Sequence, residues 1–183
     1  LILDNFEGIT VIDEAYIDFS SQPTFLKELQ KYPNLIVLQT LSKAWGAAGL
    51  RLGIAFAAPE IIAIMSNVKY PYNVNVLTQR HALEVVNDEA NMKKNLRSIL
   101  DERTRLQNEL PKLACVRKIY PTDANFILTD VGDANAVYST LMEKGVIVRN
   151  RTNVTLCEGC LRITVGIPEE NDTLLSVLKE IKE

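Results

Sequence analysis

The sequence predicts an α/β protein, in which a mostly parallel sheet within residues 1–85 precedes a small α+β domain over residues 86–183. Three continuous apolar runs in the first part are separated by helical or loop segments. Continuous apolar strands of this kind are typical of parallel sheets with both faces covered. The last third instead alternates short strands with amphipathic helices, which indicates an α+β unit. A length of 183 residues suits one large domain or two small ones.

The three apolar runs define the strands of the first part. Residues 9–12 form the first strand, which has Asp13, Glu14 and Tyr16 at its carboxyl end. Residues 35–38 form the second strand, and the segment "LRLGIAFAA" forms the third. We expect a short helix near Pro23 and another from Pro59, because proline suits the first position of a helix.

Residues 76 to about 110 have a helical pattern with a break near residues 87–88. An amphipathic helix from Ala134 should end at Gly145, and a final helix should begin at Pro168 with two acidic residues in its first turn. The remaining segments predict short strands at residues 116–121, 125–131, 146–150 and 161–166.

Composition and charge exclude several classes of protein. The net charge of −3 and the pI of about 5.3 give no basic footprint for nucleic acid. No apolar stretch approaches the ~20 residues that span a bilayer. The three cysteines are an odd, widely spaced set, and the first residues, "LILDNFEG", show no feature of a signal peptide. We therefore expect a cytoplasmic protein that binds neither nucleic acid nor membranes.

The segment "QTLSKAWGAAGLRLG" places Thr40, Ser42 and Lys43 at the end of the second strand, with Arg51 beyond two glycines. Ligands of open α/β sheets bind beyond the carboxyl ends of the strands, where Asp13 also lies. Pyridoxal 5'-phosphate needs an amine for its aldehyde, an acid for its ring nitrogen and a polar cup for its phosphate. Each residue type alone is more often a solvated charge or a turn residue, so the prediction depends on the combination.

"VIDEAYIDF" followed by "TLSKAWGAAGLRLG" resembles the fold-type I pyridoxal-phosphate aminotransferases, and among them the histidinol-phosphate aminotransferases. The resemblance covers the whole chain and implies the C-terminal part of such a sheet with its small domain. It implies Lys43 as the lysine that bonds to the cofactor, Asp13 as the partner of the pyridine nitrogen, Tyr16 as the donor to the ring oxygen, and Thr40, Ser42 and Arg51 as phosphate ligands.

The segment "GVIVRNRTN", with "EGCLRITVG" after it, is similar to the substrate-binding end of the same family. Here Arg162 resembles the arginine that holds the substrate carboxylate, and Arg149 the one that meets the phosphate of histidinol phosphate. Without the resemblance, both could equally be ordinary exposed charges. The resemblance implies amino transfer between histidinol phosphate and 2-oxoglutarate, with glutamate as a product, in a homodimer. The alternatives are a related enzyme such as threonine-phosphate decarboxylase, or an inactive fragment that folds and associates.

Other features carry less weight. "CEGC" is a lone pair of cysteines, and the single histidine, His81, is far from it in sequence, so we expect no metal site.

The family's other half would supply the ring-stacking residue and part of the phosphate cup. We therefore expect the 183-residue chain alone to be inactive, to associate with itself or with a missing segment, and to bind the cofactor weakly or not at all.

Overall fold

The computed structural model describes residues 1–181 and divides the chain into two compact units, Leu1–Lys94 and Asn95–Glu183. The boundary between the units falls within the long helix α4 (Glu89–Glu109). The division into a domain of residues 1–85 and a domain of residues 86–183 stays a prediction.

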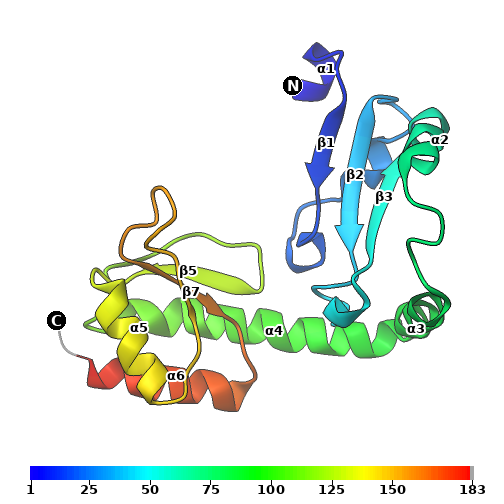
Figure 1. Cartoon of the computed structure of the whole chain (residues 1–183). Coiled ribbons are helices and arrows are strands. Elements are labelled where there is room, and N and C mark those ends of the chain that lie inside the picture. The colour runs from blue at the N-terminus through cyan, green and yellow to red at the C-terminus, as the bar shows by residue number, and fades with distance from the viewer. Residues whose placement is uncertain (182–183) are drawn as a thin grey trace. The chain divides into compact units, whose positions relative to one another are not determined.

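The first unit contains a three-stranded sheet in the order β1-β2-β3, formed by β1 (Thr10–Asp13), β2 (Leu35–Thr40) and β3 (Gly53–Ala57) (Figure 1). β1 and β2 are parallel, as expected, but β2 and β3 are antiparallel. The expectation of a mostly parallel sheet is therefore wrong for the third strand. Residues 41–52 carry only one 3₁₀ turn (Ala48–Leu50), whereas a parallel return needs a longer crossover, usually a helix.

β1 differs from its expected burial. β2 buries Leu35 and Val37 completely, but Val11 in β1 is 53% exposed. Ile9 precedes the strand and is 54% exposed. Along β1, an edge strand, burial alternates: Thr10 and Ile12 are half-buried and Val11 and Asp13 are exposed, so one face of this strand lacks the cover that the sequence pattern predicted.

The connection from β1 to β2 contains two 3₁₀ helices, Ile17–Phe19 and Phe25–Glu28, where a single short helix was expected near Pro23. Thr24 caps the second of them by accepting a hydrogen bond from the Leu26 N–H group at 3.1 Å. Residues 29–31 form a turn after this second 3₁₀ helix, and β2 begins at Leu35.

The helices after the sheet match the sequence pattern. The expected start at Pro59 and the expected break near residue 88 are both confirmed, with Asp88 between the last two helices. These helices are α2 (Pro59–Val68), α3 (Val76–Asn87) and α4, and a short helix that was not expected, α1 (Ile2–Asn5), precedes β1.

The second unit is a four-stranded antiparallel sheet in the order β4-β5-β7-β6, with helices α5 and α6. Each predicted strand and helix is found, although the edge strands are short, and the turn after α5 contains Gly145 at φ +78°. Their bounds are Lys118–Ile119 (β4), Phe126–Asp130 (β5), Ala134–Glu143 (α5), Arg149–Asn150 (β6), Cys160–Thr164 (β7) and Pro168–Glu180 (α6).

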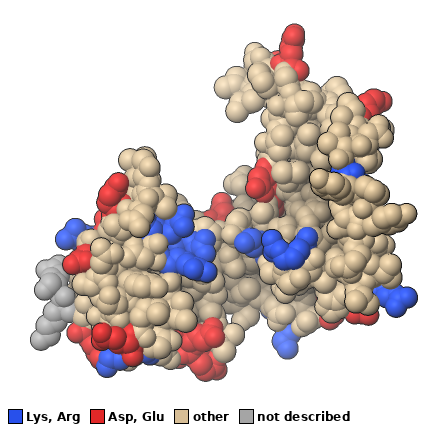
Figure 2. All heavy atoms as spheres, in the orientation of Figure 1, with Lys and Arg blue, Asp and Glu red and all other residues tan. Residues whose placement is uncertain are grey.

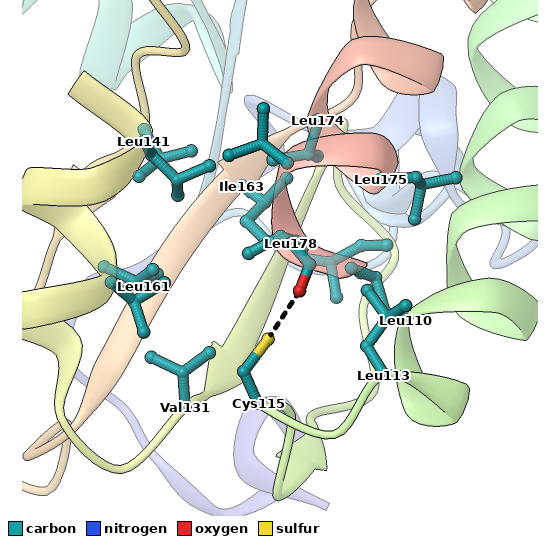
Figure 3. Packing of buried hydrophobic residues seen from close by; sticks show 14 of the residues in the cluster. Leu110, Leu113, Cys115, Val131, Leu141, Leu161, Ile163, Leu174, Leu175 and Leu178 are labelled. Atoms are coloured by element: carbon teal, nitrogen blue, oxygen red, sulfur yellow. Dashed lines mark hydrogen bonds between the residues drawn. The ribbon is translucent and has the colours of Figure 1, made fainter. Parts of the chain in front are cut away.

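One contiguous apolar core holds the second unit together (Figure 3). Leu161 and Ile163 of β7 pack against side chains from α5 and α6, including Leu141 and Leu178, which are fully buried. Cys115 joins this core, where its thiol donates a hydrogen bond to the Leu178 carbonyl at 3.4 Å. Within residues 1–181, no helix is both long and apolar enough to cross a membrane.

Candidate active site

The first group of candidate residues lies at the carboxyl ends of β1 and β2. The two strands are parallel, with Asp13 paired to Leu38, so their ends meet at one edge of the sheet. The ammonium nitrogen of Lys43 lies 5.0 Å from the centroid of the Tyr16 ring. The structure therefore brings together two residues that lie 27 positions apart in the sequence and that were assigned to one cofactor.

Two hydroxyl groups lie side by side just before Lys43. Thr40 Oγ1 is 2.9 Å from Ser42 Oγ, and it accepts a hydrogen bond from the Ser42 N–H group at 3.1 Å. Thr40 can also donate to the Leu52 carbonyl at 3.1 Å, which ties the end of β2 to the start of β3. This pairing leaves the half-buried Ser42 hydroxyl at the strand end, where it can serve as a donor.

The loop after Lys43 turns at Gly46, whose φ of +68° is a conformation that favours glycine. The second left-handed residue of this loop is Arg51, at φ +53°. The Arg51 side chain is exposed and donates to the Ala48 carbonyl at 3.2 Å. Asp13 is exposed too, and its carboxylate accepts the Ala15 N–H group at 2.9 Å. The cofactor roles of Arg51 and Asp13 stay predictions.

Glu14 is the residue of this region that sequence reasoning left without a role. It follows Asp13, but its side chain is only 6% exposed. Its carboxylate accepts hydrogen bonds from Thr24 Oγ1 at 2.7 Å, from the Phe25 N–H group at 2.6 Å and from Gln39 Nε2 at 2.9 Å. The sequence indicated only that a carboxylate follows an apolar strand, and nothing in it showed which residues would donate hydrogen bonds to that carboxylate.

The buried charge of Glu14 acts on its surroundings. Burial, together with the negative charge of Glu14, raises the pKa of the half-buried Asp18 carboxyl above its usual value. Glu14 itself receives three donors, which is what an ionised carboxylate needs in order to stay buried.

The second group lies on the sheet of the second unit, where Arg149 of β6 and Arg162 of β7 are direct cross-strand partners. Directly opposed residues of an antiparallel pair project from the same face, with Cβ atoms ~5 Å apart. Like charges in that position are unfavourable unless an anion compensates them. The two neighbours of Arg162 in β7, Leu161 and Ile163, face the core, so the arginines lie on the opposite face.

Arg162 is held by its aromatic neighbour. Its guanidinium carbon lies 5.1 Å from the centroid of the Phe126 ring, within the range of a cation–π contact. Arg162 Nε is buried and has no hydrogen-bond partner among the described residues. Figure 2 shows Lys and Arg side chains gathered on the surface of this unit. The pair thus places two positive charges on one face of this sheet.

The cysteines and the single histidine were the remaining polar candidates. Burial raises the pKa of the Cys160 thiol, which disfavours the reactive thiolate. His81 is exposed on α3, where its Nδ1 lies 2.9 Å from Glu84. Over residues 1–181, no group of three or more His, Cys, Asp or Glu side chains is close enough to hold a metal ion.

Comparison with known proteins decides the family. Residues 2–178 match the family model described as aminotransferase class I and II. The chain belongs to the class I and II aminotransferase family. Both groups of candidate residues, at the strand ends and on β6 and β7, fall inside the matched part of this aminotransferase chain.

Specific relatives are similar over nearly all of the chain. A histidinol-phosphate aminotransferase of Parabacteroides distasonis is 61% identical over 181 residues, which is 99% of this chain and 52% of that protein. The crystal structure of the histidinol-phosphate aminotransferase from Clostridium acetobutylicum superposes with a TM-score of 0.86 at 25% identity, over 94% of this chain and 53% of that one. The enzyme of the same name from Sinorhizobium meliloti, solved in complex with pyridoxal-5'-phosphate, gives 0.81 at 25% identity, over 94% and 48%. The chain thus spans about half the length of its relatives.

Proposed function

We propose that this aminotransferase chain carries the cofactor lysine and the substrate arginines of a histidinol-phosphate aminotransferase. The reaction is reversible amino transfer between histidinol phosphate and 2-oxoglutarate, which gives imidazole acetol phosphate and L-glutamate in histidine biosynthesis. The relative that is 61% identical over 99% of the chain bears that name. The structural observation that carries the proposal is the opposed pair of Arg149 and Arg162, because the phosphorylated amine and the dicarboxylate are both anionic.

The strand-end residues fit pyridoxal phosphate by the chemistry of their side chains. Lys43 supplies an amine directly over the Tyr16 ring, and Thr40 and Ser42 supply paired hydroxyl groups beside it. Asp13 supplies a carboxylate for the ring nitrogen, Tyr16 a phenol for the ring oxygen and Arg51 a guanidinium for the phosphate. When bound, the cofactor withdraws electrons from the substrate Cα, which makes the proton there acidic.

Lys43 has two tasks in this reaction. With the cofactor bound, the neutral amine of Lys43 would hold it through its aldehyde between turnovers. During turnover the freed amine would take the proton from the substrate Cα and deliver it to the cofactor carbon that carries the transferred nitrogen. The contact with Tyr16 places the Lys43 side-chain nitrogen near the ring and so orients it for both tasks.

The arginines select the substrate. Arg162 is fixed by the Phe126 ring and keeps Nε available for a carboxylate. Arg149 is opposite Arg162 in the sheet and can meet the phosphate of histidinol phosphate. A bound anion would relieve the repulsion between the two guanidinium groups, so the pair of arginines should favour binding of an anionic substrate.

The further partners in this proposal are a second copy of the complete protein and the half of the enzyme that the chain does not span.

The three cysteines of the described chain are all unpaired, which supports a reducing, cytoplasmic location.

The test joins this chain to the first half of the Parabacteroides relative and measures glutamate formed from histidinol phosphate and 2-oxoglutarate. We expect activity that is lost in Lys43→Ala and kept in Lys94→Ala, a matched exposed lysine. Release of CO2 from threonine phosphate, without glutamate formation, would instead identify the decarboxylase. An inactive joined protein that folds and binds the cofactor would refute the proposal.

A further inference from the structure

We propose that Glu14 is a positioning residue that fixes the end of β1 against the end of β2 and thereby keeps Lys43 over Tyr16. Its relevance to the cofactor rests on the proposed function, whereas its effect on the Lys43 side chain does not. The inference starts from an unusual feature, a carboxylate that is 6% exposed and lies between two candidate site residues, Asp13 and Tyr16.

The hydrogen bonds of Glu14 join three segments of the chain. Oε2 accepts from Gln39 Nε2 on β2 at 2.9 Å and from Thr24 Oγ1 on the connection at 2.7 Å. Oε1 accepts from the Phe25 N–H group at 2.6 Å. The Glu14 N–H group also donates to the Leu38 carbonyl at 2.8 Å, which extends the β1–β2 pairing by one residue.

These bonds act on both elements that carry the candidate cofactor residues. On the β1 side, the Glu14 carbonyl accepts the Ile17 N–H group at 3.0 Å, which closes the turn that contains Tyr16. On the β2 side, Gln39 directly precedes Thr40 and lies four residues before Lys43. The contact of 5.0 Å between Lys43 and Tyr16 spans the same two strand ends. A shift of one strand end against the other must therefore move the amine away from the ring.

Bonds of an ionised carboxylate to three donors are stronger than neutral ones, and the donors are left unpaired if the carboxylate is removed. Glu14→Ala removes the three side-chain bonds and keeps the backbone bond to Leu38, whereas Gln39→Met removes only the side-chain link between β1 and β2. A role confined to the turn at Phe25 would be insensitive to Gln39→Met, so this second variant separates positioning from local capping.

The first experiment needs no cofactor. In the 183-residue chain, trace acetylation followed by mass spectrometry measures the reactivity of Lys43 relative to the exposed Lys94. The Tyr16 ring lies 5.0 Å from the Lys43 amine and covers it, so Tyr16→Leu should raise the relative reactivity about two- to fivefold. We expect Glu14→Ala and Gln39→Met to raise it by at least half as much, and Glu7→Ala, which removes an exposed carboxylate, to leave it unchanged.

A double variant tests the link directly. Glu14→Gln with Gln39→Glu exchanges the amide and the carboxylate and should return the reactivity of Lys43 toward that of the natural chain. If Glu14→Ala does not fold, Gln39→Met and the exchanged pair decide the question. Unchanged Lys43 reactivity in Gln39→Met, or no effect of Tyr16→Leu, would overturn the inference.

The second experiment uses the joined enzyme with limiting pyridoxal phosphate, borohydride reduction and mass spectrometry of the peptide that contains Lys43. We expect Glu14→Ala to lower the labelled fraction about two- to fivefold, in proportion to the loss of positioned amine. If the natural sequence is not labelled but the acetylation pattern holds, the proposed function fails and the role of Glu14 in placing Lys43 stands.

Discussion

Asn171 should be among the most sensitive positions of the second unit. It lies in α6, is 2% exposed, and holds the chain just after β7, the strand that carries Arg162. Its amide donates to Glu102 Oε2 at 2.7 Å and to the Gly166 carbonyl at 3.0 Å, and its oxygen accepts the Gly166 N–H group at 3.0 Å. The replacement Asn171→Ala removes all three bonds at once.

The expected loss follows from those bonds. The bond to the ionised Glu102 contributes about 1.5–3 kcal/mol, and the two neutral bonds contribute about 0.5–1.5 kcal/mol each. Because Gly166 would keep its N–H and carbonyl groups with nothing to pair them, the free energy of unfolding of this unit should fall by roughly 3–5 kcal/mol. Thr173→Ala removes only an exposed bond to the Glu169 carbonyl and should cost less than about 0.5 kcal/mol.

The cysteines give an assay that reports on the second unit alone. All three cysteines lie within it, and Cys115 and Cys160 are buried, whereas residues 1–94 contain none. Pulse alkylation of the 183-residue chain across a urea series, read by mass spectrometry, therefore follows its unfolding. A loss below about 1 kcal/mol for Asn171→Ala, or one equal to that of Thr173→Ala, would refute this reasoning.

Three further predictions use the same chain or the joined enzyme. Hydrogen bonds from Arg105 hold the pKa of Glu102 below its usual value. The ionised Glu102 therefore contributes stability that is present above pH 4.5 and is lost as the pH falls further, and Glu102→Gln should flatten that part of the plot of urea midpoint against pH. Gly159 has φ +73°, and a Cβ added there would lie 2.7 Å from a backbone oxygen, so Gly159→Ala should lower the free energy of unfolding of the second unit by roughly 2–4 kcal/mol. Gly145 has φ +78° but open space around it, so Gly145→Ala should lower it by only about 1–2 kcal/mol. Equal losses for the two variants in urea unfolding would contradict this. In the joined enzyme, Arg149→Ala should weaken kcat/KM roughly ten- to a hundredfold for histidinol phosphate but little for glutamate, and Arg162→Ala should weaken both; equal losses for Arg149→Ala would remove its phosphate assignment.

Local chemistry made several elements of both units predictable. The helix that starts at Pro168 and the turn after α5 at Gly145, in the second unit, and the break at Asp88, in the first, each depend on the backbone of a few consecutive residues. The strands β5 and β7 were likewise found where the apolar runs lie, because the core of the second unit is contained within residues 95–183. The strand-end motif predicted Lys43 and Tyr16 as one group, and the structure places the amine over the ring.

The sequence by itself determined the family motifs, the starts of α2 and α6, the break before α4 and the identity of the candidate residues. Only the tertiary structure decided that β3 runs antiparallel, that Val11 is exposed on an edge strand and that Arg149 stands opposite Arg162. It also decided that the Glu14 side chain is buried and accepts hydrogen bonds from Thr24 and Gln39, which lie ten and twenty-five positions away. These features depend on strand order and register, which are set by contacts between distant segments and leave no periodic trace along the chain.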